Sequence, residues 1–284
     1  MSAWLPRAPC VPRHCAARPG PAAGRARTLA RLLAGTLAVL AGVLLVPLTV
    51  PLGPAARHAL TRLWCRTVIR AFGVRIRVVG TPAPGPRLVV ANHISWLDVP
   101  LVAAVLPGRM LAKSEVRHWP VLGPLAARGG TLFVERDRLR ALPGTVRELA
   151  AALRSGSRVI VFPEGSTWCG RAQGRFRPAV FQAALDAGAE VQPVRLVYRP
   201  TGPAAFVGDD PLTASLWRVA AAGRLTAEIR ILPPVAAAAR TDRRSLAAAA
   251  QRAVASDSAY LPSSSVHHRV SSRPAAASSP RTVA

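Results

Sequence analysis

Short apolar runs rich in β-branched residues alternate with longer amphipathic stretches between residues 73 and 235. Gly or Pro bounds most of the runs, as is usual for strands, and the longer stretches space their apolar residues as helices do. This alternation predicts an α/β fold with a mixed, largely parallel sheet flanked by helices. We expect strands at Val74–Val79, Arg87–Val90, Thr131–Val134, Val159–Phe162, Val191–Tyr198 and Ala227–Leu232, and helices at Leu97–Leu106, Ala141–Ser155, Pro178–Ala187 and Leu212–Ala222.

An uncharged apolar run, Leu32–Leu52, precedes this domain and is interrupted by Pro47 and Pro51. Its length suits a hydrocarbon core, which takes about 20 helical residues to cross. Arginines flank the run on both sides, and such residues favour the cytoplasmic face. We therefore predict an N-terminal membrane-embedded helical hairpin whose second helix, His58–Phe72, lies at the lipid interface. The alternative is an ordinary buried pair of helices.

The two ends of the chain differ from the α/β segment in composition. Residues Met1–Thr28 contain five arginines, no acidic residue, and several prolines and glycines, and the last residues are rich in Ser, Pro and Ala. Such composition is typical of disorder. We divide the chain into a basic disordered arm (1–28), a membrane-associated helical segment (29–72), an α/β domain (73–235), a C-terminal helix (236–255, around Asp242–Val254) and a disordered tail (256–284).

The composition narrows the class of partner. The chain of 284 residues is 50% hydrophobic and 18% charged, which excludes a disordered protein, while its net charge of +25 favours contact with something anionic. Aromatic residues make up only 5%, and no nucleic-acid-binding motif is present. We expect anionic membrane lipids as partners and no nucleic acid.

The four cysteines suggest no metal site. Cys10 and Cys15 lie in a Pro- and Arg-rich stretch without a matching second pair, and Cys65 and Cys169 are isolated. We predict that the protein binds no metal and faces the reducing cytoplasm.

The candidate chemistry begins at Asn92-His93-Ile94-Ser95-Trp96-Leu97-Asp98. His93 ends a predicted strand and Asp98 starts the next helix, so the histidine sits on a turn where side chains can reach a cleft. Asp98 can accept the proton-bearing nitrogen of the imidazole and leave the other nitrogen free to act as a general base. The alternative is a structural histidine beside an acidic residue at a helix N-terminus.

Three further blocks favour the catalytic interpretation. They are Gly130-Thr131-Leu132-Phe133-Val134-Glu135-Arg136, Val161-Phe162-Pro163-Glu164-Gly165-Ser166-Thr167 and Val191-Gln192-Pro193-Val194. With the first block, they resemble the four ordered motifs of the PlsC-type 1-acyl-sn-glycerol-3-phosphate (lysophosphatidate) acyltransferase family, over about residues 29–232. Any one of these motifs is weak evidence, whereas four in order are strong evidence.

The resemblance implies a membrane acyltransferase that uses an acyl-CoA or acyl carrier protein thioester as co-substrate and binds no cofactor. His93 would deprotonate the acceptor hydroxyl, Asp98 would orient His93, and Arg136 would hold the acceptor's anionic head group. It implies a location on the cytoplasmic face of the cell membrane. The substrate-binding residues we expect are Asn92, Lys113, Gly130, Arg136, Glu164, Gly165 and Ser166.

Lys113 and Thr167 qualify this assignment. Lys113 is the single lysine among 38 basic residues, which fits either a required ammonium or an ordinary surface lysine. Thr167 stands where many lysophosphatidate acyltransferases carry a second phosphate-binding arginine, and the alternative is that Arg171 or Arg175 takes its place. We expect 1-acylglycerol-3-phosphate as acceptor, giving phosphatidate, with another lysolipid such as lyso-ornithine lipid as the alternative. The non-enzymatic alternative is an adaptor that binds membrane or nucleic acid, which the intact His93–Asp98 pair disfavours.

Overall fold

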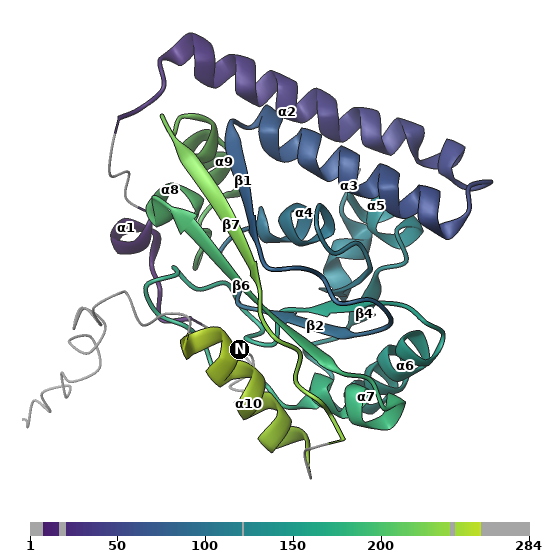
Figure 1. The fold of residues 1–284 in the computed structure, drawn as a ribbon. Coiled ribbons are helices and arrows are strands. Elements are labelled where there is room, and N and C mark those ends of the chain that lie inside the picture. Colours follow the sequence, from purple (N-terminus) through teal and green to yellow (C-terminus); the bar gives the residue numbers. More distant parts are fainter. Residues whose placement is uncertain (1–7, 17–20, 121, 239–241, 257–284) are drawn as a thin grey trace, which may run out of the picture.

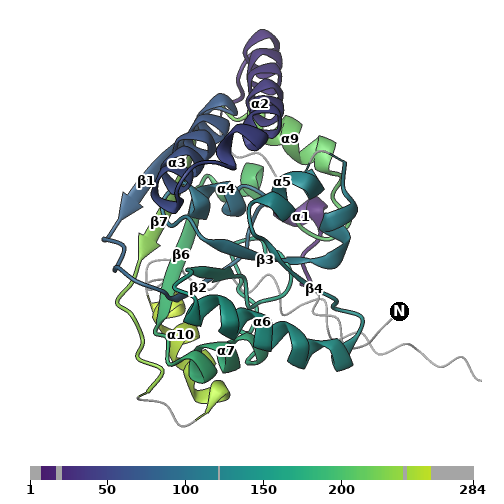
Figure 2. The same cartoon turned by 90° about the vertical axis from the view of Figure 1, so that its right-hand side faces the viewer.

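The computed structural model describes residues 8–16, 21–120, 122–238 and 242–256. Within this part of the chain, seven strands form one twisted sheet in the order β1-β7-β6-β2-β5-β3-β4 (Figures 1 and 2). The strands are β1 (Val74–Val79), β2 (Leu88–Ala91), β3 (Arg109–Lys113), β4 (Leu132–Val134), β5 (Val159–Val161), β6 (Val191–Arg199) and β7 (Leu225–Ile231).

The sheet is mixed and largely parallel, as predicted. β6 and β7 pair antiparallel, and every other neighbouring pair of described strands is parallel. The central strand β2 is buried on both faces. Its alternate residues enter two separate cores, Val89 and Ala91 on one face and Leu88 and Val90 on the other.

Helices cover both faces of the sheet (Figure 1). The core that holds Val89 also contains side chains of α3, α4 and α9, and the core that holds Leu88 contains side chains of α6, α7 and α10. The helices are α1 (Pro12–Cys15), α2 (Arg25–Leu45), α3 (Pro54–Ala71), α4 (Asp98–Ala103), α5 (Leu122–Arg128), α6 (Leu142–Arg154), α7 (Ala179–Ala187), α8 (Thr201–Ala204), α9 (Leu212–Ala220) and α10 (Arg243–Ser256), with 3-10 turns at Val46–Thr49, Ser114–His118 and Leu139–Ala141.

α2 and α3 form the predicted hairpin and lie side by side over the α4 side of the sheet (Figures 1 and 2). Glycines allow the close approach: a Cβ at Gly35 would lie 2.4 Å from the Phe72 ring, and one at Gly42 would lie 2.2 Å from the Trp64 indole. Trp64 Nε1 also donates a 2.8 Å hydrogen bond to the carbonyl oxygen of Ala38.

The N-terminal part of α2 and the chain before it are hydrogen-bonded to the α/β domain. The backbone N–H of Ala23 donates to the carbonyl of Ala221 at 2.8 Å, and Arg31 Nη1 donates to the carbonyls of Ala220 and Ala222. The segment Arg25–Thr49 is long and apolar enough to cross a membrane, and only 6% of its most apolar stretch is buried by the protein. This exposure argues against the buried helix pair that we considered from the sequence.

The described residues before α2 differ from the disordered arm we expected. Residues 8–16 pack on the domain, with Cys10, Cys15 and Ala16 buried, and α2 begins at Arg25, four residues before the predicted membrane segment. The physical reason is that Cys10 and Cys15 pack with Ala205 and Val207, so this segment does contribute to an apolar core. The predicted tail at 256–284 lies outside the described residues, except for Ser256, which ends α10.

Candidate active site

The parallel strands bring separate sequence blocks to one edge of the sheet. β2, β5, β3 and β4 are parallel neighbours, so their carboxyl ends meet at the same edge, where α/β proteins place their sites. His93 follows β2, Glu164 follows β5, and Arg136 follows β4. The predicted catalytic block and the third motif block are therefore neighbours in space.

His93 and Asp98 form the predicted pair. Nδ1 of His93 lies 2.8 Å from Oδ2 of Asp98, whose side chain is fully buried, while the His93 side chain keeps 20% exposure. The imidazole stacks on the Phe162 ring at a centroid distance of 4.2 Å and an interplanar angle of 17°. The carboxylate and the ring together fix the orientation of the imidazole, and Nε2 is the nitrogen left to exchange a proton.

The buried Asp98 carboxylate is held by donors from two elements. Oδ2 also accepts the backbone N–H groups of Ile94 and Ser95 at 2.6 and 2.9 Å, and Oδ1 accepts the Tyr198 hydroxyl at 2.6 Å. Because burial keeps water away from the carboxylate, these donors supply the hydrogen bonds that water would otherwise make. The sequence reasoning missed Tyr198, since nothing in a strand of apolar residues marks one hydroxyl as a partner of a residue 100 positions earlier.

Glu164 braces the turn that carries His93. Its Oε2 accepts the backbone N–H of His93 at 2.8 Å, and its Oε1 accepts the N–H of Gly174 at 2.9 Å. Burial raises the pKa of Glu164 to about 8, against these two hydrogen bonds that favour the charged form. The carbonyl of His93 in turn accepts the N–H of Trp168 at 2.7 Å. The two motif blocks are thus joined through backbone groups on both sides of the histidine.

Asn92 extends the pairing of β2 with β6. Its side-chain amide donates to the carbonyl of Leu196 at 3.0 Å and accepts the N–H of Leu196 at 2.8 Å. The amide thus replaces one step of the backbone ladder where β2 ends. We had expected Asn92 to bind substrate; these contacts give it a structural role in positioning the turn.

Known acyltransferases resemble this chain in sequence and in fold. A family profile described as Acyltransferase matches residues 75–197. A lyso-ornithine lipid O-acyltransferase of Pseudomonas aeruginosa is 40% identical over 202 residues, which is 70% of this chain and 78% of the relative. A 1-acyl-sn-glycerol-3-phosphate acyltransferase of Neisseria meningitidis serogroup B is 36% identical over 64% of this chain and 73% of the relative.

A solved structure agrees on the fold. The crystal structure of the 1-acyl-sn-glycerophosphate acyltransferase PlsC from Thermotoga maritima superposes with a TM-score of 0.63 at 19% identity, and covers 82% of this chain and 96% of that one. The chain belongs to the acyltransferase family. The resemblance found in the sequence is confirmed, and so is the prediction of an acyltransferase with this fold.

The acyltransferase places Arg136 and Ser166 beside the turn formed by its third motif block. Gly165 has a φ of +74°, in the left-handed region that favours glycine. Its carbonyl accepts a hydrogen bond from Nη1 of Arg136 at 2.6 Å. The guanidinium is exposed and keeps further N–H groups for a ligand. Ser166 Oγ is buried and has no hydrogen-bond partner among the described residues. Both groups lie at the turn of the third motif block, and their contact with an acceptor stays a prediction.

Lys113 and Gly130 lie at opposite edges of the sheet. Lys113 ends β3 at the same edge of the sheet, with its ammonium 5.6 Å from the centroid of the Trp119 ring. Gly130 precedes β4 at the opposite, amino edge, where its φ of +74° forms the turn into the strand and its carbonyl accepts Nε of Arg109. The acyltransferase therefore does not bring Gly130 to the other predicted substrate residues. Its motif glycine is explained by the turn.

Proposed function

We propose that the acyltransferase moves a fatty acyl group from a thioester to the free hydroxyl of a lysolipid, with His93 as general base and Asp98 as its orienting partner. The observation that supports this most directly is the 2.8 Å contact between Nδ1 of His93 and the fully buried Asp98. This contact favours the His93 tautomer that carries its proton on Nδ1, which leaves Nε2 available to the acceptor hydroxyl.

In the proposed reaction, Nε2 of His93 takes the proton of the acceptor hydroxyl as its oxygen attacks the thioester carbonyl. The tetrahedral intermediate collapses by breaking the carbon–sulfur bond, and the imidazolium returns the proton to the departing thiolate. The products are an ester and a free thiol. Asp98 stabilises the imidazolium between the two steps, and no covalent enzyme intermediate is needed.

We propose that the hairpin attaches the enzyme to one leaflet of the cell membrane on its cytoplasmic face. Exposed apolar side chains line α2 and the following turn: Leu29, Leu33, Leu37, Leu40, Leu44, Leu45, Leu48 and Val50. The chain before α2 pairs with Ala221, and α3 packs on α4, so both ends of the hairpin belong to the same domain. A helix whose two ends are held on one side supports entry and return through the same face.

The acceptor we favour is lyso-ornithine lipid, with 1-acylglycerol-3-phosphate as the second candidate. Thr167 occupies the position of the second arginine that would bind a phosphate monoester. A single arginine, Arg136, suits an acceptor with one carboxylate, such as that of ornithine. Relatives named lyso-ornithine lipid O-acyltransferase include the one at 40% identity. The Neisseria relative supports the second candidate, which was our first choice from the sequence.

The test uses the full chain in phospholipid vesicles, with acyl-CoA or acyl carrier protein as donor and each lysolipid as acceptor. We expect His93→Ala to lower the rate by about 10²–10⁴-fold, the usual contribution of a general base. His58 is an exposed residue of α3 outside the proposed pair, so His58→Ala is the matched control and should retain full activity. Full activity of His93→Ala would refute the assignment. A higher kcat/KM for 1-acylglycerol-3-phosphate than for lyso-ornithine lipid would reverse the order of acceptors.

A further inference from the structure

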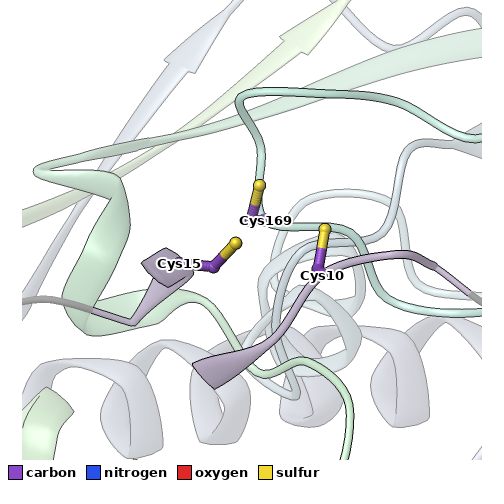
Figure 3. Close-up of side chains that lie close together, drawn as sticks. All are labelled: Cys10, Cys15 and Cys169. Carbon is purple, nitrogen blue, oxygen red and sulfur yellow. The ribbon is translucent and has the colours of Figure 1, made fainter. Parts of the chain in front are cut away.

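Three cysteines that are far apart in the sequence come together beside the third motif block (Figure 3). Cys10 precedes α1, Cys15 is its last residue, and Cys169 lies in the loop after β5. Their sulfur atoms all lie within 4.8 Å of one another, and each residue is at most 2% exposed. The sequence suggested no metal site because it showed no second pair of ligands near Cys10 and Cys15.

Backbone N–H groups surround this cysteine cluster, defined as Cys10, Cys15 and Cys169. The N–H of Cys169 hydrogen-bonds to Cys10, and the N–H of Val11 hydrogen-bonds to Cys15. Those of Arg171 and Ala172 hydrogen-bond to Cys169, and they follow Gly170, whose φ is +77°. Every sulfur therefore has a backbone donor, which is the environment that stabilises thiolates and metal-bound sulfur.

A disulfide does not account for the cysteine cluster, because it would use only two of the three buried thiols. Three sulfur atoms within 4.8 Å of one another match three corners of a tetrahedral metal site.

We propose that Cys10, Cys15 and Cys169 bind one Zn²⁺ ion, with a solvent molecule as the fourth ligand. Tetrahedral zinc with bonds of about 2.3 Å to sulfur places its sulfur ligands about 3.8 Å apart, so the cluster needs to contract by about 1 Å at most. Binding would release the three thiol protons to solvent, and three thiolates with one Zn²⁺ leave a net charge of −1 on the site. Arg171, two residues after Cys169, donates to the carbonyl of His14, the residue before Cys15, at 3.2 Å.

The site would fasten the segment before α2 to the loop that supports His93. Trp168, next to Cys169, donates its N–H to the carbonyl of His93, and Gly174 in the same loop donates to Glu164. An ion at Cys169 would hold this loop from its outer side. We therefore assign the zinc a positioning role that is independent of which lysolipid is the acceptor.

Metal analysis of the purified full chain tests the proposal. We expect about one zinc ion per chain, falling to background in each of Cys10→Ser, Cys15→Ser and Cys169→Ser. Cys65→Ala is the matched control, because Cys65 is equally buried but packs in the separate core beneath α3, and it should retain the ion. Because Cys10 and Cys15 lie outside the sheet, their variants should fold even if Cys169→Ser does not.

Two further measurements separate zinc from its alternatives. Replacement by Co²⁺ should give the sulfur-to-metal charge-transfer absorption of thiolate ligation in the wild-type chain and in Cys65→Ala, but not in Cys10→Ser. A count of thiols in the denatured, metal-free chain should give four. A count of two thiols would indicate a disulfide and overturn the proposal. Four thiols in a chain that binds no metal would also overturn it, and so would a metal content that none of the three serine variants changes.

Discussion

The hydroxyl of Tyr198 offers the sharpest test of the catalytic geometry. Tyr198→Phe removes the 2.6 Å hydrogen bond to Oδ1 of Asp98 and nothing else of comparable size. Both side chains are at most 1% exposed, so water does not replace the lost donor. A hydrogen bond to a charged group contributes about 1.5–3 kcal/mol. We expect the free energy of unfolding to fall by about 2 kcal/mol, and Tm by about 4–8 °C for a domain of this size.

The same variant should change the pH dependence of catalysis. Without the hydrogen bond from Tyr198, more of the negative charge of Asp98 lies on the oxygen that faces His93. This charge stabilises the protonated imidazole. The acid limb of kcat/KM against pH should therefore move to higher pH, by roughly one unit for 1.4 kcal/mol of added stabilisation. A shift of one unit lowers the rate by at most about tenfold, at pH values below the acid limb, and the loss should disappear at pH values above it.

Ser215→Ala is the matched control for this variant. Its hydroxyl is fully buried on α9 and accepts Trp96 Nε1 at 3.2 Å, without contacting Asp98. It should cost about 1 kcal/mol of stability and leave the pH profile where it was. Chemical denaturation and steady-state rates between pH 5 and 9 measure both effects. A pH profile of Tyr198→Phe that superposes on the wild type would refute the positioning role, whatever happens to stability.

Two further predictions concern stability. Because burial raises the pKa of Glu164 from 4.5 to about 8, its ionisation opposes folding. Wild-type stability should therefore fall as the pH rises from about 4.5 to about 8, by up to about 5 kcal/mol. Glu164→Gln should flatten this slope in denaturation curves, and an equal slope in both proteins would contradict the reasoning. Gly42→Ala should cost about 1–3 kcal/mol by pushing Trp64 away from α2, whereas Gly53→Ala, with no atom within 4 Å of its new Cβ, should leave Tm unchanged.

Local patterns were enough to predict the central features of the fold. The strand-to-helix turn at His93 and the strand before Glu164 are each encoded by contiguous residues, and parallel pairing then places them at one edge. The hairpin follows from an uncharged run that the proline-containing turn interrupts. These features need no information about distant contacts.

The features that the sequence did not reveal depend on such contacts. β3 was missed because Arg109 and Lys113 occupy its two ends and give no apolar alternation. The roles of Tyr198 and Cys169 arise only when β6 and the loop after β5 reach residues that lie 100 or more positions away. For Gly130, the sequence predicted a substrate contact where the structure shows a turn into β4 that requires glycine.

The dependence of Asp98 on β6 has a consequence for the order of events during synthesis. The turn that holds His93 emerges from the ribosome long before Tyr198, and the Asn92 side chain finds its partner Leu196 on that same late strand. A nascent or partly folded chain therefore carries an unbraced carboxylate and a loosely held imidazole. The bracing of His93 is therefore completed only when β6 docks beside β2, so the candidate site forms together with the sheet and not before it.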